Sequence, residues 1–248
     1  IDAKSLFISL ERYTRTPNEK HKKQFFLEAL SDSVHNSPNP HNYVINQSDL
    51  NNIDSSPFIY WISSGFREKF SGLKFKDSCP PKSGMATANN NRFLRFWWEI
   101  EKEKLSNEND DSIEWVRYSK GGEFRRWYGN LWLRINWNDS AQVLRDTGRA
   151  VFRNEDFYFL EGITYSALGG GSFRYLESNC VYDVGGASLF PKKKEDLYYA
   201  LAILNSKLAG YIIGCLNPTV NTQVGDIERL PYAQPSAQFF DLIDKSSK

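Results

Sequence analysis

Hydrophobic and polar positions follow three different patterns along the chain. Residues 5–13 alternate as in a β-strand. After Pro17 and Asn18 the spacing becomes helical as far as Val34, with an expected inward face of Phe25, Phe26, Leu27 and Leu30. Residues 35–56 are rich in Asn, Ser, Pro and Asp, which predicts a connector with little core of its own.

A second helix is predicted to begin near residue 56. Ser55 and Ser56 can cap it, Pro57 suits a first turn, and Gly72 ends it. Its expected buried residues recur every fourth position: Phe58, Ile62, Phe66 and Phe70.

Between residues 84 and 190 the pattern changes to short β-like runs separated by Gly and Asn. The predicted strands are 93–100, 113–118, 131–137, 151–160, 173–176 and 180–184. A long helix is expected over 195–216, then a short strand or turn at 226–230 and a helix after Pro231. The pattern indicates an α+β fold, in which helices flank a twisted mixed or antiparallel sheet and one long helix lies near the C-terminus.

Composition adds local charge to this picture. The 248 residues carry a net charge of +1, so a polyanion partner would have to meet a local patch. Residues 99–114 hold seven acids against two lysines, a net of −5. Residues 115–134 hold five cations against Glu123, a net of +4. Aromatic residues make up 15% of the chain, enough for a core and for surfaces that stack on a partner.

Cysteine usage and hydropathy favour a cytoplasmic protein without a membrane anchor. Cys79, Cys180 and Cys215 are far apart and lack metal-ligand spacing, so we expect reduced thiols. The apolar stretch 200–216 is interrupted by polar residues and is too short to span a bilayer, and no secretory signal is found. Because the first residue is Ile and the only methionine is Met85, we expect a fragment of a longer protein.

No catalytic centre is indicated by the residue pattern. His21, His35 and His41 have no Cys or paired carboxylate at ligand spacing, so we expect surface histidines and no metal site. Nucleophile turns and clustered nuclease carboxylates are also missing. The glycine run 169–171 lacks the lysine and the helix of a phosphate loop. The turn at 183–188 lacks the following helix of a cofactor loop, so a structural turn between strands is favoured.

Residues 115–128 (WVRYSKGGEFRRWY) interleave cations with planar rings around a Gly-Gly turn. Guanidinium groups can contact phosphate or a guanine edge, and aromatic rings can stack on bases. The same pattern fits a hairpin with one aromatic face in the core and solvated arginines on the other. Composition alone weighs the two interpretations about evenly.

Several segments, in order, resemble PglX-type adenine-specific DNA methyltransferases. They are 84–95 (GMATANNNRFLR), 120–129 (KGGEFRRWYG), the Asn136-Trp137 pair, 172–175 (SFRY) and 183–191 (DVGGASLFP). Residues 202–207, 216–219 and 223–231 resemble the close of a TaqI-like specificity domain. Ala88 stands where glycine is usual, and Asn89 and Asn91 replace common acidic residues.

The resemblance implies a target-recognition region within residues 55–248, joined by a connector at 1–54 to a catalytic domain that is missing from this chain. It implies double-stranded DNA as a partner, that methyltransferase domain as another, and S-adenosylmethionine only in the parent enzyme. Other proteins of a BREX phage-defence system are further possible partners. The expected DNA-contact residues are Asn89, Asn91, Arg92, Arg95, Lys120, Arg125, Arg126, Trp127, Tyr128, Arg174, Asn217, Thr222 and Gln223.

Two alternatives stay open at this point. The chain could be a protein-interaction module whose aromatic and basic face docks an acidic protein. It could also be the specificity region of a fused restriction–modification enzyme, whose parent would carry a nuclease cluster upstream.

Overall fold

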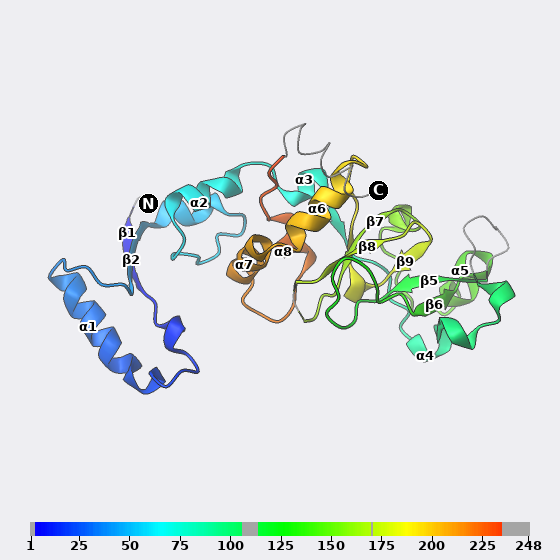
Figure 1. The fold of residues 1–248 in the computed structure, drawn as a ribbon, viewed down its shortest axis with the longest axis horizontal. Coiled ribbons are helices and arrows are strands. Elements are labelled where there is room, and N and C mark those ends of the chain that lie inside the picture. The colour runs from blue at the N-terminus through cyan, green and yellow to red at the C-terminus, as the bar shows by residue number, and fades with distance from the viewer. Residues whose placement is uncertain (1–2, 106–113, 170, 235–248) are drawn as a thin grey trace. The chain divides into compact units, whose positions relative to one another are not determined.

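The computed structural model describes residues 3–105, 114–169 and 171–234 (Figure 1). The chain divides into two units, Ile1–Gly72 and Leu73–Lys248. This boundary lies after the one expected at residue 54, because the segment that follows residue 55 belongs to the N-terminal unit. There the buried Arg67 reaches Asp49 at 3.9 Å and the Ile59 and Ile62 carbonyls at 3.3 Å.

A two-stranded sheet forms the centre of the N-terminal unit. β1 (Lys4–Ile8) pairs antiparallel with β2 (Asn42–Asn46), and α1 (Lys22–Val34) lies between them in sequence. Short 3₁₀ helices occupy Glu11–Tyr13, Glu19–His21 and Gln47–Asn52. The expectation that residues 35–56 form a plain connector is therefore wrong, because β2 acquires its hydrogen bonds from a strand distant in sequence.

The inward face predicted for α1 is also wrong. Phe26, Leu27 and Leu30 are 44%, 53% and 41% exposed, and Ala29 is the only α1 residue that is buried. His41, expected at the surface, is buried instead. Its Nδ1 lies 3.1 Å from the Ser9 carbonyl oxygen, and its Nε2 lies 3.1 Å from the Arg12 guanidinium.

The second helix begins later than predicted. α2 spans Ser64–Glu68 and continues as a 3₁₀ turn over Lys69–Ser71. Its cap is Ser63, whose hydroxyl accepts from the Phe66 N–H at 3.2 Å. Ser55 and Ser56, the expected caps, have φ of 70° and 43°, so the chain turns at these residues instead of starting a helix.

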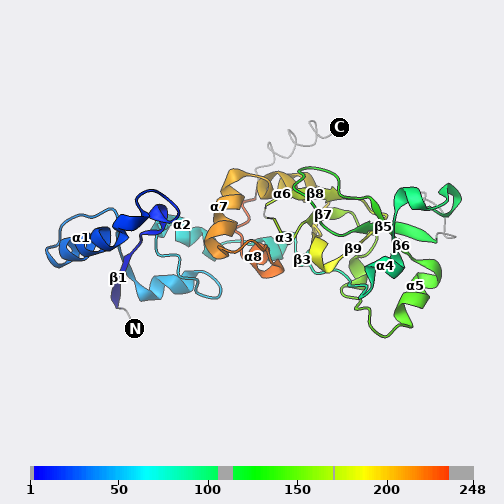
Figure 2. The ribbon, with the colours of Figure 1, turned by 90° about the horizontal axis from the view of Figure 1, so that it is seen from below.

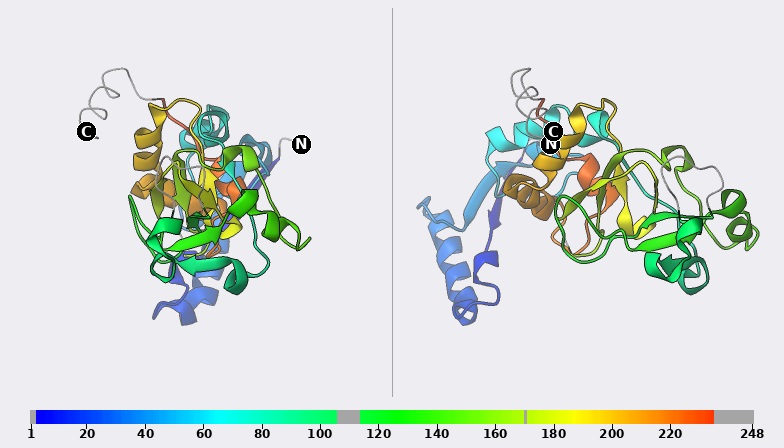
Figure 3. Two further views of the ribbon diagram at one scale, coloured as in Figure 1. Left: turned by 90° about the vertical axis from the view of Figure 1, so that its right-hand side faces the viewer. Right: turned by 45° about the vertical axis from the view of Figure 1, so that its right-hand side comes forward.

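Two four-stranded sheets organise the C-terminal unit. Figure 3 shows the ribbon from two further directions. The first is antiparallel and runs β3 (Pro81–Lys82), β10 (Ser188–Leu189), β7 (Gly162–Tyr165), β8 (Phe173–Leu176). The second runs β4 (Leu94–Phe96), β6 (Leu133–Asn136), β5 (Trp115–Ser119), β9 (Cys180–Tyr182), and its β5–β9 pair is parallel. The predicted α+β class with a mixed sheet is confirmed.

The strand predictions differ from the structure at several places: the short β3 and β10 were not expected, and within the predicted strand 93–100 only Leu94–Phe96 forms a strand. The sequence pattern missed β7, whose four residues are all buried and therefore do not alternate. Residues 151–160 form no strand. Val151 makes one isolated bridge to Ala86, and Glu155–Phe157 is a 3₁₀ turn.

Within the described residues of this unit, six helices accompany these sheets. They are α3 (Phe75–Ser78), α4 (Asn90–Phe93), α5 (Asn138–Arg145), α6 (Asp196–Leu204), α7 (Lys207–Leu216) and α8 (Val224–Glu228). α6 lies beside β7 and β8 (Figure 2). α8 replaces the strand or turn expected at 226–230, because the Asp226 carboxylate accepts from the Gln223 N–H at 2.9 Å and caps a helix. The helix expected after Pro231 lies outside the described residues.

The long helix expected over 195–216 is two helices bent by 66°. Asn205 is buried at the bend and bonds across to β8, donating to the Phe173 carbonyl at 2.9 Å and accepting from its N–H at 3.1 Å. Ser206 then caps α7 by accepting from the Ala209 N–H at 3.1 Å. No single helix in the described ranges is long and apolar enough to cross a bilayer, although this bent pair passes that test when both helices are counted together.

The core that supports the second sheet joins residues from several elements. Met85, Tyr118, Ile135 and Tyr182 are fully buried there. Cys79, Cys180 and Cys215 are all free thiols, the first two of them buried.

Candidate nucleic-acid interface

The segment expected to form a basic hairpin is a loop between β5 and β6, which we call the basic-aromatic loop (residues 120–132). Its middle is tied to the edge strand β8. The Trp127 N–H donates to the Phe173 carbonyl at 3.1 Å, and the Trp127 carbonyl accepts from the Tyr175 N–H at 2.7 Å. Trp127 has a φ of 74°, and no regular strand passes through Arg125 and Arg126. The alternation of faces that a regular strand would impose on adjacent residues therefore does not apply to these two arginines.

Side chains of this loop combine exposed rings with cations. Phe124, Trp127 and Tyr128 are all more than half exposed. The Arg126 guanidinium lies 5.2 Å from the centroid of the Phe124 ring, within cation–π range. The Arg125 guanidinium stacks on the Trp132 ring, with 4.9 Å between it and the ring centroid.

The start of the loop interlocks with the 183–191 segment. The Lys120 ammonium lies 3.1 Å from the buried Asp183 carboxylate, which also accepts from the Tyr118 hydroxyl at 2.6 Å. A Cβ at Gly121 would lie 2.7 Å from the Gly185 carbonyl oxygen, which shows how closely the two backbones approach. Two of the segments that carried the family resemblance therefore pack directly against each other.

Residues 84–95 form a capped turn that leads into β4. The Asn89 side chain accepts from the Arg92 N–H at 3.1 Å and caps α4. The Thr87 hydroxyl donates to Asn90 Oδ1 at 2.7 Å. Ala88, where glycine is usual in the family, keeps a φ of 57°, in the left-handed region that favours glycine. This geometry leaves the side chains of Asn91 and Arg92 exposed.

Two hollows border this turn. The first, about 370 Å³, we call the Phe96 hollow, and its lining residues are Asn90, Asn91, Leu94, Arg95, Phe96, Glu99, Lys120 and Leu133. The structure thus brings together Asn91, Arg95 and Lys120 from the predicted site. The second hollow, about 320 Å³, includes Asn89 and Arg92 from that site and adds Arg149.

Three arginines occupy adjacent positions across the second sheet. Arg134 on β6 is paired in register with Arg95 on β4 and with Arg117 on β5. Arg117 forms an ion pair with Glu177, whose carboxylate also accepts from the Tyr128 hydroxyl at 2.5 Å. Burial and the neighbouring Arg117 lower the pKa of the Arg134 guanidinium. Like charges in register repel one another. Glu177 neutralises Arg117 alone, so the positive charge of this sheet exceeds what its paired carboxylate neutralises.

Sequence reasoning missed several exposed residues of this region. Phe96, Trp97 and Trp98 are 41%, 48% and 58% exposed. The Trp97 N–H donates to the Trp132 carbonyl at 2.9 Å, which ties this run to the end of the basic-aromatic loop. The predicted strand 93–100 includes this run, although three successive large rings cannot all face one core in an alternating strand. This conflict was the signal in the sequence that some of these rings are exposed.

Two predicted contact residues are misplaced. The Arg174 side chain is fully buried and donates to Ser172 and Ser166 at 3.2 Å, so it has no surface to offer DNA. Burial lowers its pKa to about 10. Thr222 is 3% exposed and is likewise unable to meet a duplex. Both predictions are wrong because residue type alone does not show whether neighbouring elements cover a side chain.

Asn217 and Gln223 lie in the loop after α7, and this loop satisfies most of its polar groups internally. The Asn217 side chain donates to the Asp226 carboxylate at 2.7 Å and to the Asn221 carbonyl at 3.0 Å. Its oxygen accepts from the Thr219 N–H at 3.1 Å. Gln223 caps α8 and remains exposed.

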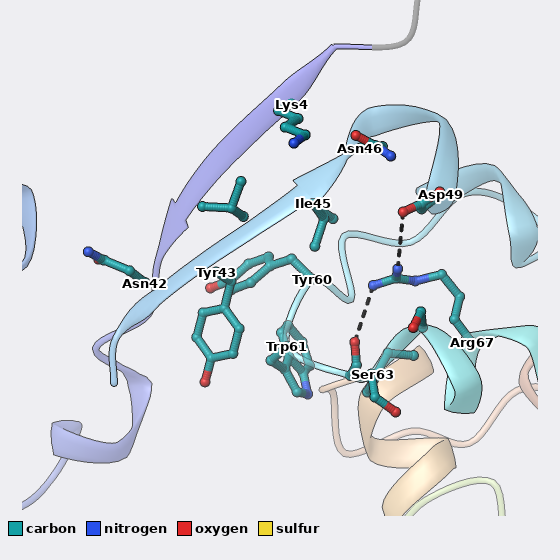
Figure 4. A pocket seen from close by; sticks show the side chains of 13 residues that line it. Lys4, Asn42, Tyr43, Ile45, Asn46, Asp49, Tyr60, Trp61, Ser63 and Arg67 are labelled. Carbon is teal, nitrogen blue, oxygen red and sulfur yellow. Dashed lines mark hydrogen bonds and ion pairs between the residues drawn. The ribbon is translucent and has the colours of Figure 1, made fainter. Parts of the chain in front are cut away.

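The N-terminal unit has a separate hollow of about 590 Å³ beside β2 (Figure 4). Tyr43, Tyr60 and Trp61 line it, and the Tyr43 and Tyr60 ring centroids are 5.5 Å apart. Arg67 and Asp49 approach each other at its border. None of the predicted DNA-contact residues lines this hollow.

Among the described residues we find no arrangement of side chains suited to binding a metal ion or to nucleophilic catalysis. No group of three or more His, Cys, Asp or Glu side chains there could hold a metal ion. The turn at 183–188 is a 3₁₀ turn between β9 and β10, as predicted. Both Asp183 oxygens are occupied, Oδ1 by the Gly185 N–H at 2.7 Å and Oδ2 by Tyr118 and Lys120. The arrangement is suited to contacting a ligand through cations, amides and rings.

Comparison with known proteins finds relatives of this chain among the adenine-specific methyltransferases. No family model matches it. It is 33% identical over 253 aligned residues to the adenine-specific methyltransferase PglX of Lacticaseibacillus casei (strain Zhang), covering 94% of this chain and 20% of that protein. It is 31% identical over 218 residues to the adenine-specific methyltransferase BrxX of Escherichia coli O9:H4 (strain HS), covering 86% of this chain and 17% of that protein. Over most of its length the chain is therefore homologous to PglX- and BrxX-type adenine-specific methyltransferases, and it spans about a fifth of their length.

Proposed function

We propose that this chain is the part of an adenine-specific DNA methyltransferase that grips double-stranded DNA and recognises its sequence. The observation that supports the proposal most directly is the charge of the second sheet and its loops. Within the part of the chain that the structure describes, no ion pair neutralises the arginines of this region: Arg92, Arg95, Arg125, Arg126, Arg134 and Arg149. Exposed rings lie among these guanidinium groups.

The physical task of such an enzyme explains this combination. A methyltransferase that modifies a base takes that base out of the helical stack, which needs firm contacts to the rest of the duplex. Cations contact the phosphates and position the protein, whereas side chains at base edges read the sequence. The near-neutral net charge is compatible, because residues 115–134 carry a local net charge of +4 that acids elsewhere, including the net −5 of residues 99–114, offset in the total.

S-adenosylmethionine does not fit the residues present here. The only turn with a suitable order of acid and glycines has its carboxylate buried and fully used by neighbours within the fold. We assign the cofactor and the methyl transfer to another part of the methyltransferase polypeptide, which becomes the expected partner of this chain.

The test is duplex binding by the intact protein at several salt concentrations, with Arg125→Ala and Arg126→Ala. Each lost phosphate contact should weaken binding and reduce the slope of log affinity against log salt by about one. Arg15→Ala removes the same charge from an exposed position of the N-terminal unit and serves as the matched control. An unchanged salt slope in the Arg125 and Arg126 variants would contradict the assignment of the basic-aromatic loop. Binding to an acidic protein in place of duplex DNA would favour the protein-interaction alternative.

A further inference from the structure

The Phe96 hollow has a chemical character different from the arginine-rich surface around it. Its lining combines one aromatic residue, Phe96, with the apolar Leu94 and Leu133, and its polar residues include Asn90, Asn91 and the acid Glu99. Its volume of about 370 Å³ lies within the roughly 300–1,000 Å³ range of sites that enclose small organic groups.

The aromatic wall is held in place before any ligand arrives. Phe96 stacks on Trp98 with a centroid distance of 4.6 Å and an angle of 5°, and Trp98 meets Trp97 edge-on at 5.6 Å. The Phe96 N–H donates to Glu99 Oε2 at 2.7 Å, which fixes the ring and the carboxylate relative to each other. A braced, 41% exposed ring on the border of a hollow is a stacking surface for a planar group.

The cations of the hollow are already engaged. Arg95 Nη1 donates to the Asn91 and Leu94 carbonyls at 2.8 and 2.7 Å, and Lys120 is paired with Asp183 at 3.1 Å. Glu99 adds a negative charge that disfavours a phosphate at this position. Within the described residues, the other Glu99 oxygen makes no hydrogen bond, and neither does the Asn91 side-chain amide. The hollow therefore offers acceptors and donors to a neutral polar edge.

We propose that the Phe96 hollow receives one unstacked adenine or cytosine of the DNA and recognises it through its exocyclic amine. The base stacks on Phe96, donates its amine to the free oxygen of Glu99, and presents its remaining edge to the Asn90 and Asn91 carboxamides. A carboxylate accepts well from such an amine, and a carboxamide pairs with both donors and acceptors of a base edge. The base must leave the stack to meet the ring face-on. This inference rests on the proposed binding of DNA.

The experiment removes the amine and its acceptor separately. Duplexes that contain the sequence methylated by the intact protein are prepared with single replacements of adenine by purine or of cytosine by 2-pyrimidinone, each of which lacks the exocyclic amine. Affinities are measured for the wild-type protein, Glu99→Gln, Phe96→Leu and the control Glu103→Gln. Glu103 is an exposed acid of the same segment and does not line the hollow.

At one position of the duplex, loss of the amine should weaken wild-type binding about tenfold, as expected for a hydrogen bond to a charged group. Glu99→Gln should bind the natural duplex more weakly and lose little further affinity at that position, whereas Glu103→Gln should behave as wild type. Phe96→Leu should weaken binding of the natural duplex about tenfold through lost stacking. Thermal unfolding of each variant confirms that the fold is kept.

Two results would overturn the inference. Salt-dependent duplex binding with no position coupled to Glu99 would eliminate the base site and leave the proposed function standing. Absence of salt-dependent duplex binding by the wild-type protein would remove the proposed function and the base site together.

Discussion

Gly186→Ala tests the close packing between the 183–191 segment and the start of the basic-aromatic loop. A Cβ at Gly186 would lie 2.7 Å from both the Gly121 nitrogen and the Ser119 carbonyl oxygen, and 2.9 Å from the Lys120 carbonyl carbon. All three are backbone atoms, so no side-chain rotation can relieve the contact. The β5 end and the loop that follows it must move.

The expected loss of stability in Gly186→Ala follows from the contacts that the added Cβ would disturb. Inserting one carbon into a packed site costs about 1–3 kcal/mol. Moving the Lys120 backbone also loosens its ammonium from the Asp183 carboxylate, now at 3.1 Å, so we expect the upper end of that range. For a unit of this size about 3 kcal/mol corresponds to a fall in Tm of roughly 6–12 °C.

Thermal unfolding followed by circular dichroism measures this change. Gly210→Ala in α7 is the matched control, because no atom lies within 4 Å of its added Cβ. Alanine there should raise the helix stability by up to about 1 kcal/mol, so the two alanines should shift Tm in opposite directions. If Gly186→Ala unfolded within about 1 °C of the wild type, the backbones would not be in tight contact and the reasoning would be refuted.

Three further predictions concern the interior. Asn205→Ala should destabilise the C-terminal unit by roughly 3 kcal/mol, as chemical denaturation will measure. The substitution leaves the Phe173 N–H without its acceptor and removes two further hydrogen bonds at the α6–α7 bend. Burial raises the pKa of Cys79 and Cys180 to about 12. Iodoacetamide at pH 8 should therefore modify the partly exposed Cys215 and leave Cys79 and Cys180 unmodified until the protein unfolds. Peptide mass mapping measures the modification of each thiol. Because the Cys79 and Cys180 thiols keep their protons in the folded state, stability should fall as pH rises from about 9 toward 12, and equal Tm values across that window would contradict their burial.

Local pattern was sufficient for much of the C-terminal unit. The predicted strands over 131–137, 173–176 and 180–184 contain β6, β8 and β9, because their short apolar runs bounded by Gly, Asn or Ser leave few alternatives to an extended chain. The turn at 183–188 and the grouping of Asn91 and Arg95 also followed from the sequence, since neighbours in a short turn stay close in any fold. The family resemblance depended in the same way on ordered local motifs.

Tertiary packing decided which of these residues face solvent. Arg174 has the same charge as Arg125, but β8 turns it into the interior, whereas the left-handed turn at Trp127 leaves Arg125 outside. The α1 face of Phe26 and Leu30 has helical periodicity and yet stays exposed, since periodicity describes the helix and not what covers it. The Phe96 hollow needs Lys120 beside β4, and strand pairing between β4, β6 and β5 brings them together. Burial and site geometry come from contacts between residues distant in sequence, whereas pattern and propensity act over a few neighbouring positions.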